Sequence, residues 1–275
     1  ELLVYPDLPS ARRLAASVRR GRFREEGKRT RGQLGLGTEF ESIREYQPDD
    51  DIRRVNWAAT ERLGRPMTNQ YRIEQDRDVV CVVDTGRLMG APLRGATRLD
   101  VALDAVAAVA AVADELGDRA GLVAFDREVR RHLRPRRRGA RAVVQASFDL
   151  EPSAAQSDYA LAFHRIGGTK RSFVLVLTDL LEESAAGPLV DAMPILARRH
   201  HVVVATATDP ELTVESPASA FEAFRAVAIT EMAAARARAA SSLRHAGAVV
   251  VEAEPERLGA ACVQAYLRAK ARSRL

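Results

Sequence analysis

The stretch D-V-V-C-V-V-D, from Asp78 to Asp84, decides the fold of this 275-residue chain. An unbroken apolar run bounded by an acid at each end is typical of a β-strand that is buried on both faces of a sheet. Such strands occur in parallel sheets that are covered by helices on both sides. The stretch therefore predicts an α/β domain, and the segments after it should alternate between helix and strand.

The segments that follow do alternate in this way. Expected strands cover 119–125, 129–133, 172–178, 201–206 and 248–251, and expected helices cover 99–116, 140–148, 159–166, 188–199, 218–246 and 255–271. Strands that alternate with helices of about ten or more residues give a mostly parallel sheet. We expect residues 78–275 to form a Rossmann-like domain, with a mostly parallel central sheet and helices on both faces.

Residues 1–77 have a different character, because they are rich in arginine, glutamate and glycine. A short basic helix is expected over 14–23, and strands are expected over 38–46 and 66–73. Gly35-Leu36-Gly37 resembles a phosphate loop, but no strand precedes it and no G-K-[ST] follows, so a turn is expected there. We therefore expect an irregular, β-containing extension before the α/β domain.

Composition excludes several classes of protein. The net charge of +5 is a mild excess of 42 Lys+Arg over 37 Asp+Glu, which permits contact with anionic surfaces without requiring it. No run of about eighteen apolar residues is present, so no membrane span is predicted. Cys81 and Cys262 both lie in apolar segments without metal-ligand spacing, which indicates reduced core thiols in a cytosolic protein.

Two carboxylates, Asp84 and Asp179, each follow directly on a predicted buried strand. In open α/β sheets the ligand crevice lies at the carboxyl ends of the strands, near the point where the strand order reverses. If the two strands are neighbours, these carboxylates and the hydroxyl of Ser157 form an oxygen-rich site suited to Mg²⁺ or Mn²⁺. The alternative is that each aspartate caps the turn or helix after its strand.

The order of elements resembles a von Willebrand factor A-like domain, a fold that often carries a metal-ion-dependent adhesion site. That site has the pattern D-x-S-x-S after the first strand, a threonine in a later loop and an aspartate after a central strand. Asp84 and Asp179 match the two aspartates, and Ser157 replaces the threonine, but Gly86 and Leu88 stand where the serines belong. The resemblance implies a degenerate metal site, in which Arg87 would take the place of the cation if no metal binds.

A longer pattern precedes this domain, within residues 35–62. The sequence E-F-x-x-I-R-E-Y-x-P-x-D-D-x-R-x-V-x-W, from Glu39 to Trp57, resembles the signature of the bacterial "domain of unknown function 58" family. The matching charged and aromatic positions are Glu39, Arg44, Glu45, Tyr46, Asp50, Asp51, Arg53 and Trp57. The chain departs from the family pattern at Asp49, Asn56 and Glu61.

The resemblance implies a non-enzymatic protein–protein interaction module on the cytoplasmic side of the bacterial membrane, held there by a segment outside this chain. It also implies a MoxR-type AAA+ ATPase as partner, and an unknown client protein that the two assemble or activate together. We expect the contact at the crevice, through Thr85, Arg87 and Asp158 beside the metal-site residues. For the signature itself, an equally supported interpretation is structural: its charges pair, and Trp57 anchors the extension on the α/β domain.

The sequence has three other functional interpretations. A metal-dependent hydrolase would use Asp84 and Asp179, but no general base or second metal is evident. The basic stretch 130–141 is the best candidate for nucleic acid or anionic lipid, although it lacks aromatic residues for base stacking; its alternative is a solvated strand-to-helix loop. Asp84-Thr85-Gly86 spells the aspartic protease motif, but it occurs once, and on the wrong fold.

Overall fold

The protein is an α/β molecule built on a six-stranded sheet, as expected from the sequence. The computed structural model describes residues 8–19, 39–48, 50, 52–72, 77–166, 171–180, 183–212 and 219–271. The sheet has the strand order β10-β9-β8-β3-β6-β7, in which only β7 runs antiparallel to its neighbour. Its strands are β3 (Asp78–Asp84), β6 (Arg119–Phe125), β7 (Val129–Arg137), β8 (Phe173–Leu177), β9 (His201–Ala207) and β10 (Val249–Ala253).

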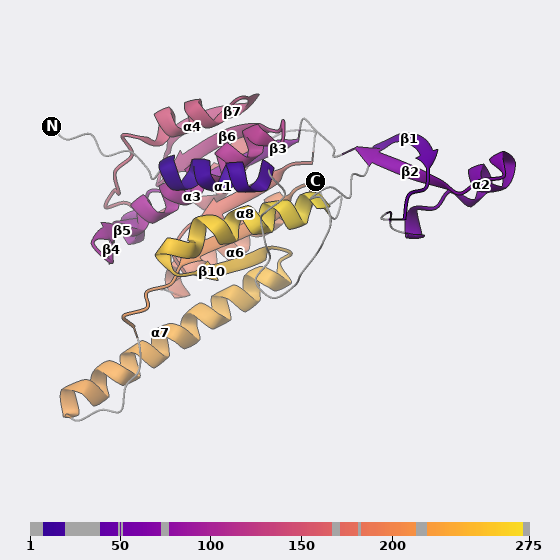
Figure 1. Cartoon of the computed structure of the whole chain (residues 1–275). Helices are drawn as coiled ribbons and strands as arrows, with labels where there is room; N and C mark the ends of the chain where they lie inside the picture. Colours follow the sequence, from indigo (N-terminus) through magenta and orange to yellow (C-terminus); the bar gives the residue numbers. More distant parts are fainter. Residues whose placement is uncertain are drawn as a thin grey trace.

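Helices cover both faces of this sheet (Figure 1). One core lies between the sheet and the helices α1 (Leu8–Arg19), α3 (Arg98–Glu115), α4 (Ala140–Ser147) and α8 (Pro255–Ala271). A second core lies between the opposite face and α5 (Tyr159–Ile166), α6 (Glu183–Ala197) and the end of α7 (Ala220–His245). Alternate residues of β3 belong to different cores: Cys81 faces the first, and Val80 and Val82 face the second. This is the arrangement that the apolar run of β3 predicts.

The two thiols are also where the sequence places them. Cys81 and Cys262 are free and fully buried in the first core. Burial disfavours the thiolate, so the pKa of Cys81 is raised to about 12 and that of Cys262 is raised as well. Both side chains therefore act as small apolar groups in the core.

The segment before β3 divides into two parts. Helix α1 packs on α3 through Ala11, Ala15 and Val18, so it belongs to the α/β body. The family signature forms a separate small lobe, made of β1 (Glu39–Glu45), a 3₁₀ turn (Ile52–Arg54), α2 (Trp57–Leu63) and β2 (Met67–Arg72). Figure 1 shows this lobe standing to one side of the sheet and its helices.

Several boundaries differ from those expected. Helix α1 begins before the expected basic helix at 14–23, and α6 begins before 188 because it accommodates Pro188 and Pro194 within its length. The largest difference is β7, which extends to Arg137 where a short strand and a loop were expected. Pro135 fits there because β7 is an edge strand, which leaves half of its backbone groups without ladder partners. Gly35-Leu36-Gly37 lies outside the described residues.

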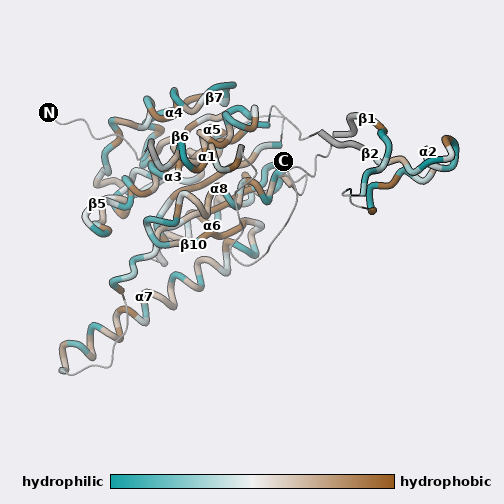
Figure 2. Tube along the Cα trace, in the orientation of Figure 1, coloured by the Kyte–Doolittle hydropathy of each residue, from teal (hydrophilic) through white to brown (hydrophobic). Residues whose placement is uncertain are grey.

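Helix α7 extends beyond the sheet, and its first half has little packing. Figures 1 and 2 show it running away from the body, with apolar and polar positions mixed along it. Its buried residues are concentrated near its end, at Ala239, Ala240 and Leu243. Phe221 and Phe224, in its first turns, are exposed.

Candidate functional site

The crevice lies where the direction of strand addition reverses. From β3 the chain crosses through α3 to β6 on one side, and later returns to β8 on the other side of β3. Parallel neighbours end at the same edge, so Asp84, the last residue of β3, lies near Thr178 and Asp179, which follow β8. The expected convergence of the two strand ends is therefore present, at the switch point where α/β proteins bind ligands.

Asp84 is the centre of a hydrogen-bond network. Its Oδ1 accepts hydrogen bonds from the backbone N–H of Gly86 at 2.7 Å and from Ser157 Oγ at 2.5 Å. Its Oδ2 accepts from Thr178 Oγ1 at 2.7 Å and from the Tyr159 hydroxyl at 3.0 Å. Asp84 thus both caps the turn after its strand and joins three hydroxyl groups from two separate segments, the start of α5 and the end of β8.

Burial changes the titration of this network. Tyr159 is buried, and burial together with the negative charge of Asp84 raises the pKa of its phenol well above the usual value. Tyr159 therefore stays protonated and acts as a hydrogen-bond donor. Neither Tyr159 nor Thr178 was singled out from the sequence, although Thr178 directly precedes Asp179 and Tyr159 follows Ser157 by two residues.

The position that carries the first serine of an adhesion site has no room for a side chain. A Cβ atom on Gly86 would lie 2.2 Å from Ser157 Oγ and 3.1 Å from Asp84 Oδ1. The hydroxyl of Ser157 occupies that space and reaches Asp84 directly. A side chain at Gly86 would therefore force Ser157 Oγ to move, in a space that the backbone carbonyl of Ala155 also borders at 3.0 Å, so the two positions form one steric unit.

Asp179 is paired with a buried arginine that the sequence analysis missed. The Nε atom of Arg98 lies 3.0 Å from Asp179 Oδ2, and both side chains are at least nine-tenths buried. The guanidinium also donates to the carbonyl of Ala207 at the end of β9, at 2.9 Å. Arg98 opens α3, directly after a capping box formed by Thr97 and Asp100. The available signal was that Arg98 is the one basic residue of α3, at the start of a helix rich in apolar residues.

Arg98 therefore already supplies a cation beside Asp179, which is the role that was expected of Arg87. Arg87 is exposed at the mouth of the crevice, and its backbone N–H donates to the carbonyl of Ala155 at 2.9 Å. A second guanidinium, that of Arg236 on α7, also lies near Asp179 and Arg98, and burial lowers its pKa. Its Nε and Nη2 atoms are buried without a hydrogen-bond partner.

The donors at this crevice do not fit a divalent metal. Both oxygens of Asp84 already accept two hydrogen bonds each, and Asp179 is neutralised by Arg98. A hard cation such as Mg²⁺ needs oxygen ligands with free lone pairs and is repelled by buried guanidinium groups. In the described part of the chain, no group of three or more His, Cys, Asp or Glu residues is arranged to hold a metal ion.

The three residues expected to bind a partner differ in how exposed they are to solvent. Thr85 is buried, and its hydroxyl donates to the carbonyl of Phe125, so its side chain does not offer a contact surface as expected. Asp158 is exposed, and its carboxylate accepts from the backbone N–H of Leu161 in the first turn of α5. Arg87, Leu88 and Met232 help to line a cavity of about 750 Å³ over Asp179.

The signature residues stabilise their own lobe. Arg44 forms two hydrogen bonds with the carboxylate of Asp50, at 2.6 and 2.8 Å, and Asp50 also accepts from the backbone N–H of Gln47. This pairing lowers the pKa of Asp50. The hydroxyl of Tyr46 donates to the carbonyl of Asp50, and Glu45 lies 3.8 Å from Arg65. The side chain of Glu39 and the whole of Asp51 lie outside the described residues, and Arg53 is exposed.

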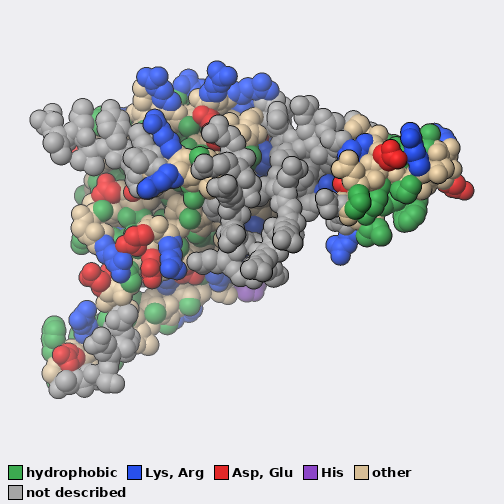
Figure 3. All heavy atoms as spheres, viewed as in Figure 1, with side chains coloured by type: hydrophobic (Ala, Val, Ile, Leu, Met, Phe, Trp, Pro, Cys, Tyr) green, Lys and Arg blue, Asp and Glu red, His purple; other side chains and the backbone are tan. Residues whose placement is uncertain are grey.

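Trp57 is not the anchor that the sequence analysis expected. Asn56 caps α2 by accepting from the N–H of Ala59, and Gly64 ends the helix with a positive φ of 67°. This capping leaves Trp57, the first residue of α2, 69% exposed. Ile52 and Leu63 are exposed on the same lobe, where Figure 3 shows hydrophobic side chains gathered on one side.

The fold and the crevice together define an α/β domain with a Rossmann-like, mostly parallel sheet that carries an additional lobe. The family model described as "Protein of unknown function DUF58" matches residues 42–251, and the chain belongs to this family. The uncharacterized proteins Mb1516 of Mycobacterium bovis and Rv1480 of Mycobacterium tuberculosis are each 28% identical to it over 196 residues. That alignment covers 66% of this chain and 58% of each relative, so the chain spans less than two thirds of their length.

Two solved structures are similar. The conserved hypothetical protein BatB from Bacteroides thetaiotaomicron aligns with 15% identity and a TM-score of 0.49, covering 72% of this chain and 99% of BatB. The D319A mutant of the PilB minor pilin from Streptococcus sanguinis aligns with 9% identity and a TM-score of 0.50, covering 76% of this chain and 65% of the pilin. The second likeness supports the α/β fold, and at this identity it supports nothing finer. Within the residues that the structure describes, no helix is long and apolar enough to cross a membrane.

Proposed function

We propose that this protein is a non-enzymatic protein-interaction module whose principal contact surface is the signature lobe. The observation that carries the proposal is the exposure of Ile52, Trp57 and Leu63 on that lobe, at 68%, 69% and 52%. Exposed apolar groups gathered on one face mark interaction sites, and tryptophan is the residue type most enriched among those that dominate binding. The Arg44–Asp50 pair would hold this surface in shape before the partner arrives.

The partner that we propose is a MoxR-type AAA+ ATPase, which would act with this protein on a client that is still unknown. This part of the proposal rests on the family resemblance. So does the proposed location at the cytoplasmic face of a bacterial membrane, through a segment outside this chain. Fractionation of cells that express the complete gene product tests the location, since recovery of the protein only in the supernatant contradicts it.

A binding role at the crevice is also more consistent with the geometry than hydrolysis. Asp84 is hydrogen-bonded and Asp179 is ion-paired within the crevice, and the two residues are only 4% and 2% exposed. A hydrolase needs a nucleophile or an activated water beside a free base. The cavity over Asp179, with Arg87 and Leu88 at its rim, therefore serves in this proposal as a secondary contact surface.

One binding experiment separates the two surfaces. The purified chain is titrated against the MoxR-type ATPase of the same genome, using Trp57→Ala/Leu63→Ala for the lobe and Arg87→Ala/Asp158→Ala for the crevice. Val249→Ala, at an exposed apolar position on β10, is the matched control. A central tryptophan contributes about 2 kcal/mol or more, so the lobe variant should bind roughly thirtyfold more weakly while the control is unchanged.

Each alternative outcome has a defined meaning. If only the crevice variant loses affinity, the lobe is not the principal contact. If the unmodified chain shows no binding to the ATPase, with or without nucleotide, the proposed partner is wrong.

A further inference from the structure

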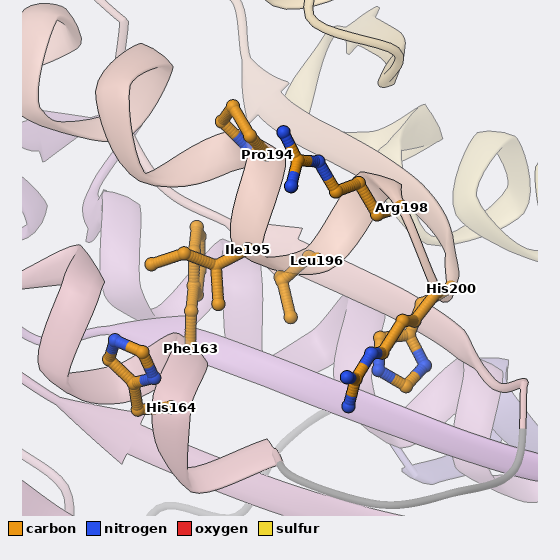
Figure 4. A pocket seen from close by; sticks show the side chains of 8 residues that line it. Phe163, His164, Pro194, Ile195, Leu196, Arg198 and His200 are labelled. Atoms are coloured by element: carbon orange, nitrogen blue, oxygen red, sulfur yellow. The ribbon is translucent and has the colours of Figure 1, made fainter.

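A second cavity, of about 530 Å³, lies between α5 and α6. It lies where the parallel strands begin, at the end of the sheet opposite the crevice. Its residues come from the ends of both helices and from His200, which directly precedes β9 (Figure 4). This volume is within the range of about 300–1,000 Å³ that is usual for small-molecule sites. None of the signature residues and none of the strand-end residues is among those that line this cavity.

The walls of the cavity are apolar. Phe163 on α5 and Leu196 on α6 are buried in the second core and present part of their surface to the cavity, beside the half-buried Ile195 and the exposed Pro194. We call Phe163, Pro194, Ile195 and Leu196 the apolar wall. A wall of this kind favours the hydrocarbon or aromatic part of a ligand, because its burial removes apolar surface from water.

The rim of the cavity is cationic. It consists of His164 at the end of α5 and of Arg198 and Arg199 after α6, and none of the described residues that line the cavity is acidic. We call Arg198 and Arg199 the cationic rim. Both are exposed and therefore able to approach a ligand. Guanidinium groups bind carboxylate and phosphate oxygens through paired hydrogen bonds.

His200 adds a buried donor beside this rim. Its side chain is only 6% exposed, and it lines the cavity. Its Nδ1 accepts a hydrogen bond from the backbone N–H of Ser172 at 3.3 Å, so the proton of the neutral ring is on Nε2. Burial and the nearby charges of Arg199 and Arg171 lower the pKa of His200, which keeps the ring neutral near pH 7. The Nε2–H group is therefore the donor that this ring can offer to a ligand.

We propose that this cavity binds a small amphipathic anion, with a carboxylate or phosphate head at the cationic rim and an apolar body against the apolar wall. The Nε2–H of His200 would donate to the head group, and the guanidinium groups would neutralise it. Charge complementarity selects an anion, and the wall selects against small inorganic ions. The inference is independent of the proposed protein partner, because none of the residues that line this cavity belongs to the signature lobe or to the crevice.

Calorimetric titration of the full chain tests the site. The probes are sodium decanoate and decyl phosphate below their micellar concentrations, with acetate, decanol and decyltrimethylammonium as controls for head, tail and charge. The variants are Arg198→Ala/Arg199→Ala, which removes the rim, and Ile195→Trp, which fills the cavity. Arg62→Ala/Arg225→Ala removes two exposed arginines elsewhere and is the matched control.

We expect one decanoate or decyl phosphate per chain, and the tighter of the two identifies the head group. Affinity should fall at least tenfold in the rim variant, disappear in Ile195→Trp and stay unchanged in the matched control. All substituted positions are exposed or half-buried, so the far-ultraviolet circular dichroism should match that of the unmodified chain. Equal binding of decyltrimethylammonium, equal loss in the matched control, or binding to phosphatidylglycerol vesicles without binding of either monomeric anion would each overturn the proposal.

Discussion

Asp84 and Asp179 end neighbouring strands, yet their charges are stabilised in different ways. Asp84 accepts four hydrogen bonds from uncharged donors, whereas Asp179 lies against the guanidinium of Arg98. An adhesion-type site would place one metal ion between such carboxylates. In this protein an internal cation and three hydroxyl groups stabilise them, so the crevice is complete without a metal.

The buried pair of Arg98 and Asp179 should be strongly coupled. Arg98→Met leaves Asp179 as a buried charge without its cation and should lower the free energy of unfolding by about 3–5 kcal/mol. Arg98→Met/Asp179→Leu removes both charges and should recover most of that loss, because an apolar pair of similar volume is often neutral. Urea unfolding of the two variants and of Asp179→Leu measures the coupling. Simple additivity of the single changes would contradict it.

Gly86 and Ser157 should behave as one steric unit. Gly86→Ser restores the first serine of the adhesion motif, but its Cβ collides with Ser157 Oγ, so it should destabilise the protein by about 1–3 kcal/mol. Gly86→Ser/Ser157→Gly frees the space and should be more stable than Gly86→Ser alone. Thermal unfolding of both variants, with Gly90→Ser as a nearby glycine control, gives the comparison. If the double variant is the less stable one, the steric account fails.

At the scale of elements, the family signature forms a self-contained unit. It builds a two-stranded hairpin with a capped helix inserted between the strands, and its charge pair fixes the turn after β1. Pairing within the lobe satisfies the polar residues, and the apolar residues are left at the surface. Arg44 and Asp50 thus pair with each other inside the lobe, and Trp57 lies exposed on it instead of anchoring it on the α/β domain.

The role of the basic stretch 130–141 depends on the strand in which most of it lies. It forms the edge strand β7 and the start of α4, not the expected loop, and Figure 3 shows Lys and Arg side chains gathered along this edge. Charged residues on an edge strand prevent pairing with a second molecule. Its arginines therefore have a structural role that does not require nucleic acid.

Removing charge from β7 should allow this edge strand to pair with a second molecule. Arg134→Val/Arg136→Val keeps a strand-forming sequence while removing two exposed charges, and it should increase self-association at a given concentration. Arg134→Lys/Arg136→Lys retains the charge and should remain like the unmodified chain. Light scattering during size-exclusion chromatography distinguishes them. Identical behaviour of the two variants would show that charge does not protect this edge.

At the scale of the whole molecule, the two ends of the parallel strands carry different chemistry. The carboxyl ends of the strands carry the aspartate network and the buried guanidinium groups, and the end where the strands begin carries the cavity with the cationic rim. The signature lobe and the first half of α7 extend from this body with exposed apolar residues (Figure 1). Such a molecule is suited to simultaneous contacts on separate surfaces.

The stability of the whole domain should not depend on divalent metal. An ion that binds only the native state raises the unfolding temperature, and the rise grows with the logarithm of the ion concentration. Because the crevice lacks free oxygen ligands, the unfolding temperature should be the same in millimolar Mg²⁺, millimolar Mn²⁺ and excess chelator. Scanning calorimetry measures this, and Asp84→Asn serves as the control for any shift that occurs elsewhere. A rise that Asp84→Asn abolishes would contradict a metal-free crevice.

The sequence by itself determined the fold class, the core strands and the meeting of the strand ends that carry Asp84 and Asp179, because these follow from local hydrophobic patterns and from the rule that parallel strands end together. Only the tertiary structure decided that Arg98 pairs with Asp179, that Ser157 excludes a side chain at Gly86 and that Trp57 faces solvent. Periodicity reports which residues are buried, and it does not report which distant partner compensates a buried charge. That choice depends on the packing of α3 across the end of β8, which brings together segments that no local pattern connects.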